Sequence, residues 1–192
     1  AYINTWILEM KTNESDKDLC MDALITARYF AIKKAPYFSE MLYSLTPIII
    51  PNFKYVAACT KKHVLLIGLE KFLDLKNIKS YKSKQAVKTA NHADELRAGV
   101  LIHECNHLLR DLSRLEEMDD KELANAAFDI PINDDMVNAG WLLPEYGLFS
   151  DKLGLPPDLT GEQYYELLKQ KKDQSSKSST TFTLGDDDVS SG

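Results

Sequence analysis

Apolar residues in the N-terminal part of the chain recur at the three- and four-residue steps of an α-helix. This pattern predicts a helix over residues 19–34. Its expected buried stripe consists of Leu19, Ala23, Ala27, Phe30 and Ala31. The polar residues 11–18 are expected to form a loop before this helix, and Pro36 is expected to end it. A second, short helix is expected over residues 37–45, with Ser39 as a candidate cap.

Two short runs of aromatic and aliphatic residues follow these helices. Residues 53–58 and 63–68 have the composition of strands, and residues 59–62 separate them. They predict a β-hairpin, although the turn lacks an Asn-Gly pair. Residues 74–90 are rich in lysine and have little apolar periodicity, so we expect a mobile surface connection with solvated charges.

The middle of the chain predicts three helices. The first spans about residues 93–116 and begins with acidic side chains, which the helix dipole favours at that end. A second covers residues 121–128, and Pro131 is expected to interrupt it. A third is expected over residues 132–139, with Gly140 following its last residue.

The C-terminal part combines a long loop, a helix and a polar tail. Residues 141–157 contain several prolines and glycines, as a loop does. Thr160 and Gln163 have the spacing of a capping box and open the last helix. We expect one domain over residues 1–172, followed by a disordered tail or a linker over residues 173–192.

Composition narrows the class of protein. The 192 residues are 44% hydrophobic, which is enough for a globular core. The net charge is −6 and the lysines are scattered, which argues against nucleic acid as the main partner. No apolar run reaches the length of a transmembrane helix, and no signal peptide is visible. Three cysteines without framework spacing favour reduced thiols and a cytoplasmic protein.

The chain also contains an H-E-x-x-H motif, formed by His103, Glu104 and His107. Residues four apart lie on one face of a helix, so both imidazoles can reach the same metal ion. Glu104 lies beside them, where its carboxylate could accept a proton from a metal-activated water. A random chain of this length shows the motif about once in a few hundred cases. The competing interpretation is an ordinary polar helix face with a solvated Glu104.

A catalytic zinc site usually has a third protein ligand. The metzincin continuation of the motif is excluded, because Arg110 and Ser113 occupy the required positions. Asp111 lies on the same face but too far along the helix from the first histidine. Asp129 follows an apolar segment, where a carboxylate needs a partner. The residues alone leave two roles open for Asp129: metal ligand, or cap of a helix whose first turn contains Pro131.

Several further motifs accompany the H-E-x-x-H helix. They are Pro36-Tyr37-Phe38, Leu108-Leu109 directly after the motif, an N-x-A-x-D-x-x-I-N pattern at residues 125–133, and the segments at residues 143–148 and 162–168. With these motifs, residues 20–170 resemble the metallopeptidase domain often found N-terminal to von Willebrand factor A-like domains in bacteria and phages. The chain departs from many relatives at Asp111, where they have histidine, at Ala124, where they have tryptophan, and in the turn at residues 60–62.

The resemblance implies a mainly helical α+β fold of the zincin type, with a small hairpin or sheet packed on the motif helix. It also implies that Asp129 is the third ligand of a Zn²⁺ ion bound by His103 and His107. The predicted function is hydrolysis of a peptide or protein substrate, with Glu104 as general base. The alternative is a metal-stabilised protein-interaction module without turnover, with a protein partner bound through the tail. Neither a nucleic acid nor a membrane is expected as a partner.

Overall fold

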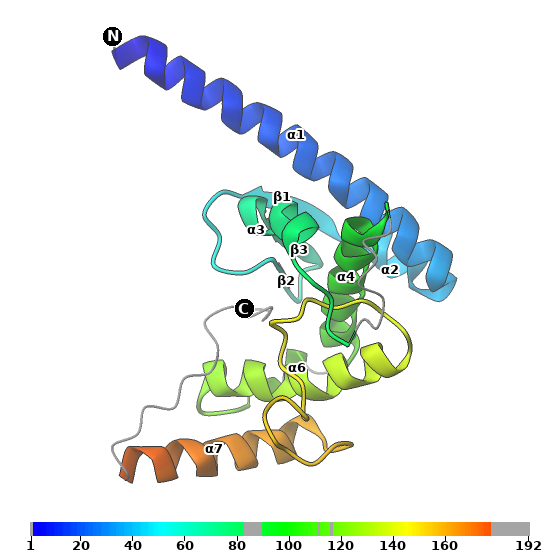
Figure 1. Cartoon of the computed structure of the whole chain (residues 1–192), viewed down its shortest axis with the longest axis vertical. Coiled ribbons are helices and arrows are strands. Elements are labelled where there is room, and N and C mark those ends of the chain that lie inside the picture. The colour runs from blue at the N-terminus through cyan, green and yellow to red at the C-terminus, as the bar shows by residue number, and fades with distance from the viewer. Residues whose placement is uncertain (1, 83–89, 111, 116, 178–192) are drawn as a thin grey trace.

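The chain folds into a small sheet surrounded by helices (Figure 1). The computed structural model describes residues 2–82, 90–110, 112–115 and 117–177. Helix α1 (Tyr2–Lys34) crosses one end of the molecule, and its N-terminal part extends beyond the rest. Helix α4 (His92–Arg110) occupies the centre. At the other end, α6 (Lys121–Asn138) and α7 (Gly161–Lys177) lie side by side in opposite directions. The predicted α+β, mainly helical class is confirmed.

Helix α1 is longer than the sequence pattern predicts. The loop expected over residues 11–18 is wrong, because the helix is continuous from Tyr2 to Lys34. This segment contains no proline or glycine, and its polar residues are compatible with helical backbone. The buried stripe also differs, since Leu19 is 55% exposed whereas Cys20 and Leu24 are buried. The helix ends before Pro36, as predicted.

Two short helical segments follow α1, in the region where one helix was expected. They are a 3-10 helix, η1 (Pro36–Phe38), and α2 (Ser39–Ser44). Ser39 is the first residue of α2, and the cap position belongs to Phe38, so the expected role of Ser39 is wrong.

The sheet has three strands in the order β1-β3-β2. Strands β2 (Ala57–Cys59) and β3 (Val64–Gly68) form the predicted antiparallel hairpin, although β2 begins later than expected. Strand β1 (Thr46–Ile50) was not predicted and pairs in parallel with β3. Its Pro47 is tolerated because β1 is an edge strand. Strand β2 packs on α4, which brings the sheet against the H-E-x-x-H helix.

The segment between β3 and α4 begins with helical structure. Helix α3 (Leu69–Asp74) continues into the 3-10 helix η2 (Leu75–Asn77), so the start of the expected surface connection is ordered. Ser80 then forms a β-bridge with Pro144. Residues 83–89, which belong to the same predicted connection, lie outside the described residues.

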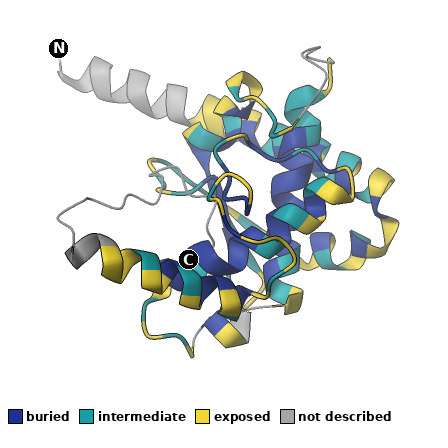
Figure 2. Ribbon diagram, turned by 60° about the horizontal axis from the view of Figure 1, so that its bottom comes forward, coloured by how far each residue is buried: buried dark blue, intermediate teal, exposed yellow. Residues whose placement is uncertain are grey.

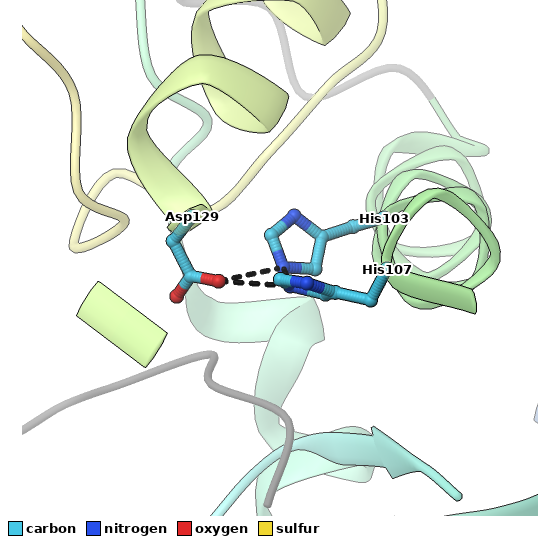
Figure 3. A group of neighbouring side chains, drawn as sticks. All are labelled: His103, His107 and Asp129. Atoms are coloured by element: carbon cyan, nitrogen blue, oxygen red, sulfur yellow. Dashed lines mark hydrogen bonds and ion pairs between the residues drawn. The ribbon is translucent and has the colours of Figure 1, made fainter. Parts of the chain in front are cut away.

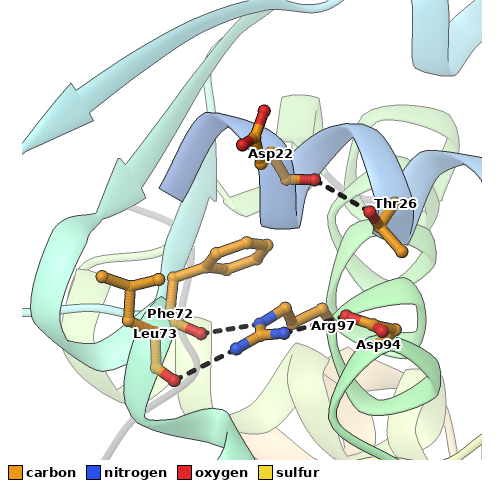
Figure 4. A network of polar contacts seen from close by, with 6 residues as sticks. All are labelled: Asp22, Thr26, Phe72, Leu73, Asp94 and Arg97. Atoms are coloured by element: carbon orange, nitrogen blue, oxygen red, sulfur yellow. Dashed lines mark hydrogen bonds and ion pairs between the residues drawn. The ribbon is translucent and has the colours of Figure 1, made fainter. Parts of the chain in front are cut away.

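Arg97 joins α4 to the end of α3 (Figure 4). This buried side chain donates hydrogen bonds to the carbonyl oxygens of Phe72 (3.0 Å) and Leu73 (3.1 Å), and it pairs with Asp94 at 2.9 Å. The last carbonyls of a helix have no partner within the helix. Arg97 therefore stabilises the end of α3 and fixes it against the central helix.

Helix α6 is continuous through Pro131, so the interruption expected there is wrong. A proline inside a helix removes one backbone hydrogen bond and crowds the preceding turn. Packing on both sides of the proline offsets this cost, since Phe128, Ile130 and Ile132 are fully buried. The end of the helix agrees with the prediction, because Gly140 follows it with φ of +81°.

The other helix boundaries agree in part with the predictions. The helix expected over residues 93–116 corresponds to α4 up to Arg110 and to α5 (Leu112–Leu115), and residues 111 and 116 lie outside the described residues. The capping box is confirmed at α7, where Thr160 and Gln163 exchange hydrogen bonds. Helix α7 continues to Lys177, so residues 173–177 are helical rather than part of a tail. Residues 178–192 of the expected tail lie outside the described residues.

Two hydrophobic cores meet along α6. Figure 2 shows buried residues, in dark blue, gathered in the interior of the molecule. The first core lies between α1, the sheet, α3 and α4, and includes Ile132 and Met136 of α6. The second core lies between α6 and α7 and includes Phe128 and Ile130. Within the described part of the chain, no helix combines the length and apolarity needed to cross a bilayer.

Replacing Arg97 with Met tests the link between α3 and α4. The variant keeps an apolar stem but leaves two helix-end carbonyls and Asp94 without their partner. We expect chemical denaturation to show a loss of about 2–4 kcal/mol in the free energy of unfolding. As a matched control, Arg114→Met removes a half-exposed pair with Glu162 and should cost less than about 1 kcal/mol. Equal losses in the two variants would contradict this role of Arg97.

Candidate metal centre

The motif histidines lie on a buried face of α4, as their spacing predicts. Both side chains are fully buried. Their rings meet edge to face, with centroids 4.6 Å apart and planes at 76°. Both present Nε2 to the same point, and these two atoms are 2.9 Å apart (Figure 3).

Helix α6 brings Asp129 to the same point from the opposite side (Figure 3). Its Oδ1 lies 2.8 Å from Nε2 of His107 and 3.4 Å from Nε2 of His103. Asp129 lies inside α6, which begins at Lys121. The alternative role as the cap of a helix beginning near Pro131 is therefore wrong, because no helix begins there.

The three atoms have the arrangement of a metal-ligand set. Their separations of 2.8–3.4 Å are close to the ~3.3 Å between ligands of a tetrahedral ion with bonds of about 2.0 Å. Two imidazole nitrogens and a carboxylate are ligands typical of zinc and of other first-row transition metals. His103, His107 and Asp129 could thus hold a metal ion. Three protein ligands leave a fourth position open, as in catalytic rather than structural zinc sites.

The two histidines stabilise the charged form of Asp129. Burial by itself would raise the pKa of Asp129. Hydrogen bonds and charge interactions with His103 and His107 outweigh that effect and hold the pKa of Asp129 below its usual range. The outer nitrogen of His103, Nδ1, is buried with no hydrogen-bond partner among the described residues. Packing therefore orients this ring, in place of the hydrogen bond that usually orients a metal-binding histidine.

Glu104 is fully buried next to the cluster. Burial raises the pKa of its carboxyl group, and the nearby charges of His103 and His107 offset part of that rise. Neither carboxylate oxygen accepts a hydrogen bond of ordinary geometry from the described residues, although the backbone of Cys59 in β2 is close enough to lower the pKa slightly. A buried carboxylate with so little hydrogen bonding is costly, and such groups are typical of chemically active sites.

Gly99 permits the approach of α4 to the segment after α6. It lies one turn before His103 on the same face of α4. A Cβ atom at this position would be 1.9 Å from the carbonyl oxygen of Leu142, so only glycine fits without a backbone shift. Gly99 was not among the site residues expected from the sequence. A glycine in the middle of a helix was the available signal, because it costs helix stability unless it serves packing.

Two polar residues near the motif in sequence are engaged elsewhere. Arg110 pairs with Asp135 at 2.9 Å, with both side chains largely exposed. His92 contacts the carbonyl oxygen of Ile78 through Nε2 at 3.3 Å. The four predicted site residues are thus the ones that the fold brings together: the three candidate ligands and Glu104 beside them.

Comparison with known families agrees with this geometry. The family model described as "Putative metallopeptidase domain" matches residues 89–189, which are 101 of the 192 residues. The chain belongs to this metallopeptidase-domain family. The matched region contains α4, α6 and α7, and therefore all four predicted site residues. No significant similarity was found to a curated protein or to a solved structure. The expected association with von Willebrand factor A-like domains stays a prediction.

The variant Gly99→Ala tests the helix approach in this metallopeptidase-domain protein. The added methyl group must displace the backbone at Leu142, and we expect a loss of about 1–3 kcal/mol in the free energy of unfolding. Because Gly99 and His103 share a face of α4, metal affinity should fall as well. Gly154→Ala is the control: its φ of +61° also disfavours alanine, but no atom lies within 4 Å of the added methyl group. Unchanged metal affinity in Gly99→Ala would contradict the expectation that the close approach at Gly99 positions the metal ligands.

Proposed function

We propose that this protein is a zinc-dependent hydrolase, and most specifically a peptidase. The observation that carries the proposal is the convergence of His103, His107 and Asp129 on one point, with Glu104 buried beside it. The ligands come from two helices that meet only in the folded chain. Membership of the metallopeptidase-domain family supports the same reaction class.

Each residue has a defined role in this proposal. His103, His107 and Asp129 hold the zinc ion through Nε2, Nε2 and a carboxylate oxygen. When bound, a zinc ion would supply Lewis-acid chemistry, lowering the pKa of a water molecule toward neutrality and polarising a carbonyl group. Glu104 accepts a proton from the attacking water and passes it to the leaving amine. The carboxylate of Glu104 has no competing hydrogen bond of ordinary geometry among the described residues, so it is available for that proton.

Access for the substrate is the demanding part of the proposal. His103, His107 and Glu104 have an exposed fraction of 0%, and Asp129 has 2%. A peptide bond can approach Glu104 only when part of the covering structure moves. When the covering structure is closed over the site, it excludes water and strengthens electrostatic interactions at the reacting groups.

Metal content tests the ligand set directly. We expect about one zinc ion per chain by elemental mass spectrometry, on protein purified without a histidine tag and then supplied with zinc. His103→Ala, His107→Ala and Asp129→Asn should each weaken zinc binding by more than the ~10–100-fold typical of changes outside the ligand set.

The control for the metal assay is His63→Asn. His63 has φ of +57°, a conformation that asparagine tolerates well, and its ring contacts Ser44 rather than the cluster. This variant should retain the metal. Full zinc content in Asp129→Asn would contradict the role of Asp129 as the third ligand. A parent protein that contains no zinc after zinc is supplied would contradict the whole site.

The substitution Glu104→Gln separates catalysis from metal binding. Glutamine keeps the size of the side chain but cannot accept the proton, so peptide hydrolysis should fall by about 10²–10⁴-fold. Zinc content should remain unchanged. The substitution removes a buried charge, so the free energy of unfolding should not decrease. Cleavage of a fluorogenic peptide library by the zinc-loaded protein is the measurement. The exposed Glu166→Gln is the matched control and should retain full activity.

The same experiment addresses the alternative of an interaction module without turnover. Such a module would bind zinc and unfold on chelation, but would cleave no peptide in the library. That outcome would contradict the peptidase proposal while leaving the metal centre intact.

A further inference from the structure

A second candidate site lies at the end of α1, away from the metal ligands. A pocket of about 390 Å³ opens between the C-terminal end of α1, the first turns of α4 and the segment after α6. This volume is within the ~300–1,000 Å³ of small-molecule sites. None of His103, Glu104, His107 and Asp129 lines the pocket. Its chemistry is therefore separate from the hydrolytic site.

Two aromatic side chains provide the apolar walls. Phe30 comes from α1, and Trp141 follows α6 with an exposed fraction of only 9%. The ammonium group of Lys34 lies 4.6 Å from the centre of the Trp141 ring and donates a hydrogen bond to the carbonyl oxygen of Gly140. An ammonium group has three donors, and this contact uses one of them. Lys34 is thus positioned at the pocket and retains donors for a ligand.

The pocket also contains charges of both signs. Lys33 and Lys34 are exposed lysines on the α1 side, and Glu95 lines the pocket from α4. Partial burial lowers the pKa of Lys34, and the charge of Glu95 opposes that change. The carboxylate of Glu95 therefore acts on the charge of Lys34, and the two residues form no ion pair with each other among the described residues. Opposite charges thus line the same pocket.

We propose that this pocket binds an apolar α-amino carboxylate, as a free amino acid or a short peptide. The ligand carboxylate pairs with Lys33 and Lys34, its ammonium group pairs with Glu95, and its apolar side chain packs on Phe30 and Trp141. Both ligand charges then meet a charge of the opposite sign on the protein. The aromatic walls contribute the burial of apolar area.

Other classes of ligand fit the pocket less well. A simple anion would face the negative charge of Glu95 as well as the two lysines. A purely apolar molecule would displace water from three charged groups and supply no partner, which is costly. A zwitterion with an apolar side chain meets all of these requirements together.

Calorimetric titration of the full chain with three related probes tests the proposal. The probes are L-phenylalanine, 3-phenylpropionate, which lacks the ammonium group, and phenethylamine, which lacks the carboxylate. We expect saturable binding of L-phenylalanine, weakened about 5-fold or more by loss of either charge. No saturable binding of L-phenylalanine, or equally tight binding of all three probes, would overturn the proposal. This comparison uses the parent protein and does not depend on the folding of a variant.

Two substitutions then assign the protein charges. Glu95→Gln should weaken L-phenylalanine about 5-fold or more but should strengthen 3-phenylpropionate, because the repulsion of its carboxylate is removed, whereas Lys33→Ala should weaken both. Glu166→Gln and Lys76→Ala are matched exposed controls and should change neither affinity. Unchanged affinity for L-phenylalanine in both pocket variants would place its binding elsewhere and overturn the assignment.

A further pair of probes distinguishes the two sources of the ligand. Tighter binding of L-phenylalanine than of glycyl-L-phenylalanine would assign the site to free amino acids, and the reverse order would assign it to short peptides. Both outcomes support the shared chemistry. Preferential binding of N-acetyl-L-phenylalanine over both would overturn the role of Glu95. Glu104→Gln should leave all these affinities unchanged, so this result stands or fails separately from the proposed hydrolysis.

Discussion

The close approach of α4 and α6 is the constraint on which the candidate centre depends. Helix α4 belongs to the first core, and α6 contributes to both cores. Gly99 allows the carbonyl oxygen of Leu142 to reach the surface of α4, where any larger residue would push the two segments apart. With this distance set, Asp129 lies within 3.4 Å of both histidines. A small shift of either helix would separate the carboxylate from the imidazoles, because interiors this closely packed transmit displacements.

The centre also concentrates polar groups where the fold would otherwise be apolar. His103, Glu104, His107 and Asp129 are all buried, and they come from α4 and α6, which contact each other. Burial of such groups is unfavourable unless hydrogen bonds or a metal compensate for the lost water. Contacts within the cluster stabilise the charge of Asp129, whereas Glu104 receives little compensation. Burial of Glu104 therefore destabilises the fold and raises the pKa of its carboxyl group, which makes the carboxylate a stronger base. Such a combination is common at catalytic sites.

Local signals in the sequence predicted local structure well. The Thr160–Gln163 capping box, the glycine after α6 and the hairpin all depend on residues close together in sequence, and all are present. Errors arose where distant packing overrode a local preference. Pro131 lies inside a continuous helix because two cores hold its flanking turns. Strand β1 was missed because its parallel pairing with β3 depends on a partner separated from it in the chain.

Sequence by itself determined the half of the centre that one helix contains. Helical periodicity is a local property, so the spacing of His103 and His107 sufficed to place both on one face of α4, with Glu104 beside them. The residues alone could not choose between ligand and cap for Asp129. That choice depends on whether α6 continues through Pro131 and on how it crosses α4, which are properties of packing. The pocket beside Trp141 likewise exists only in the tertiary structure, because three separate segments form its walls.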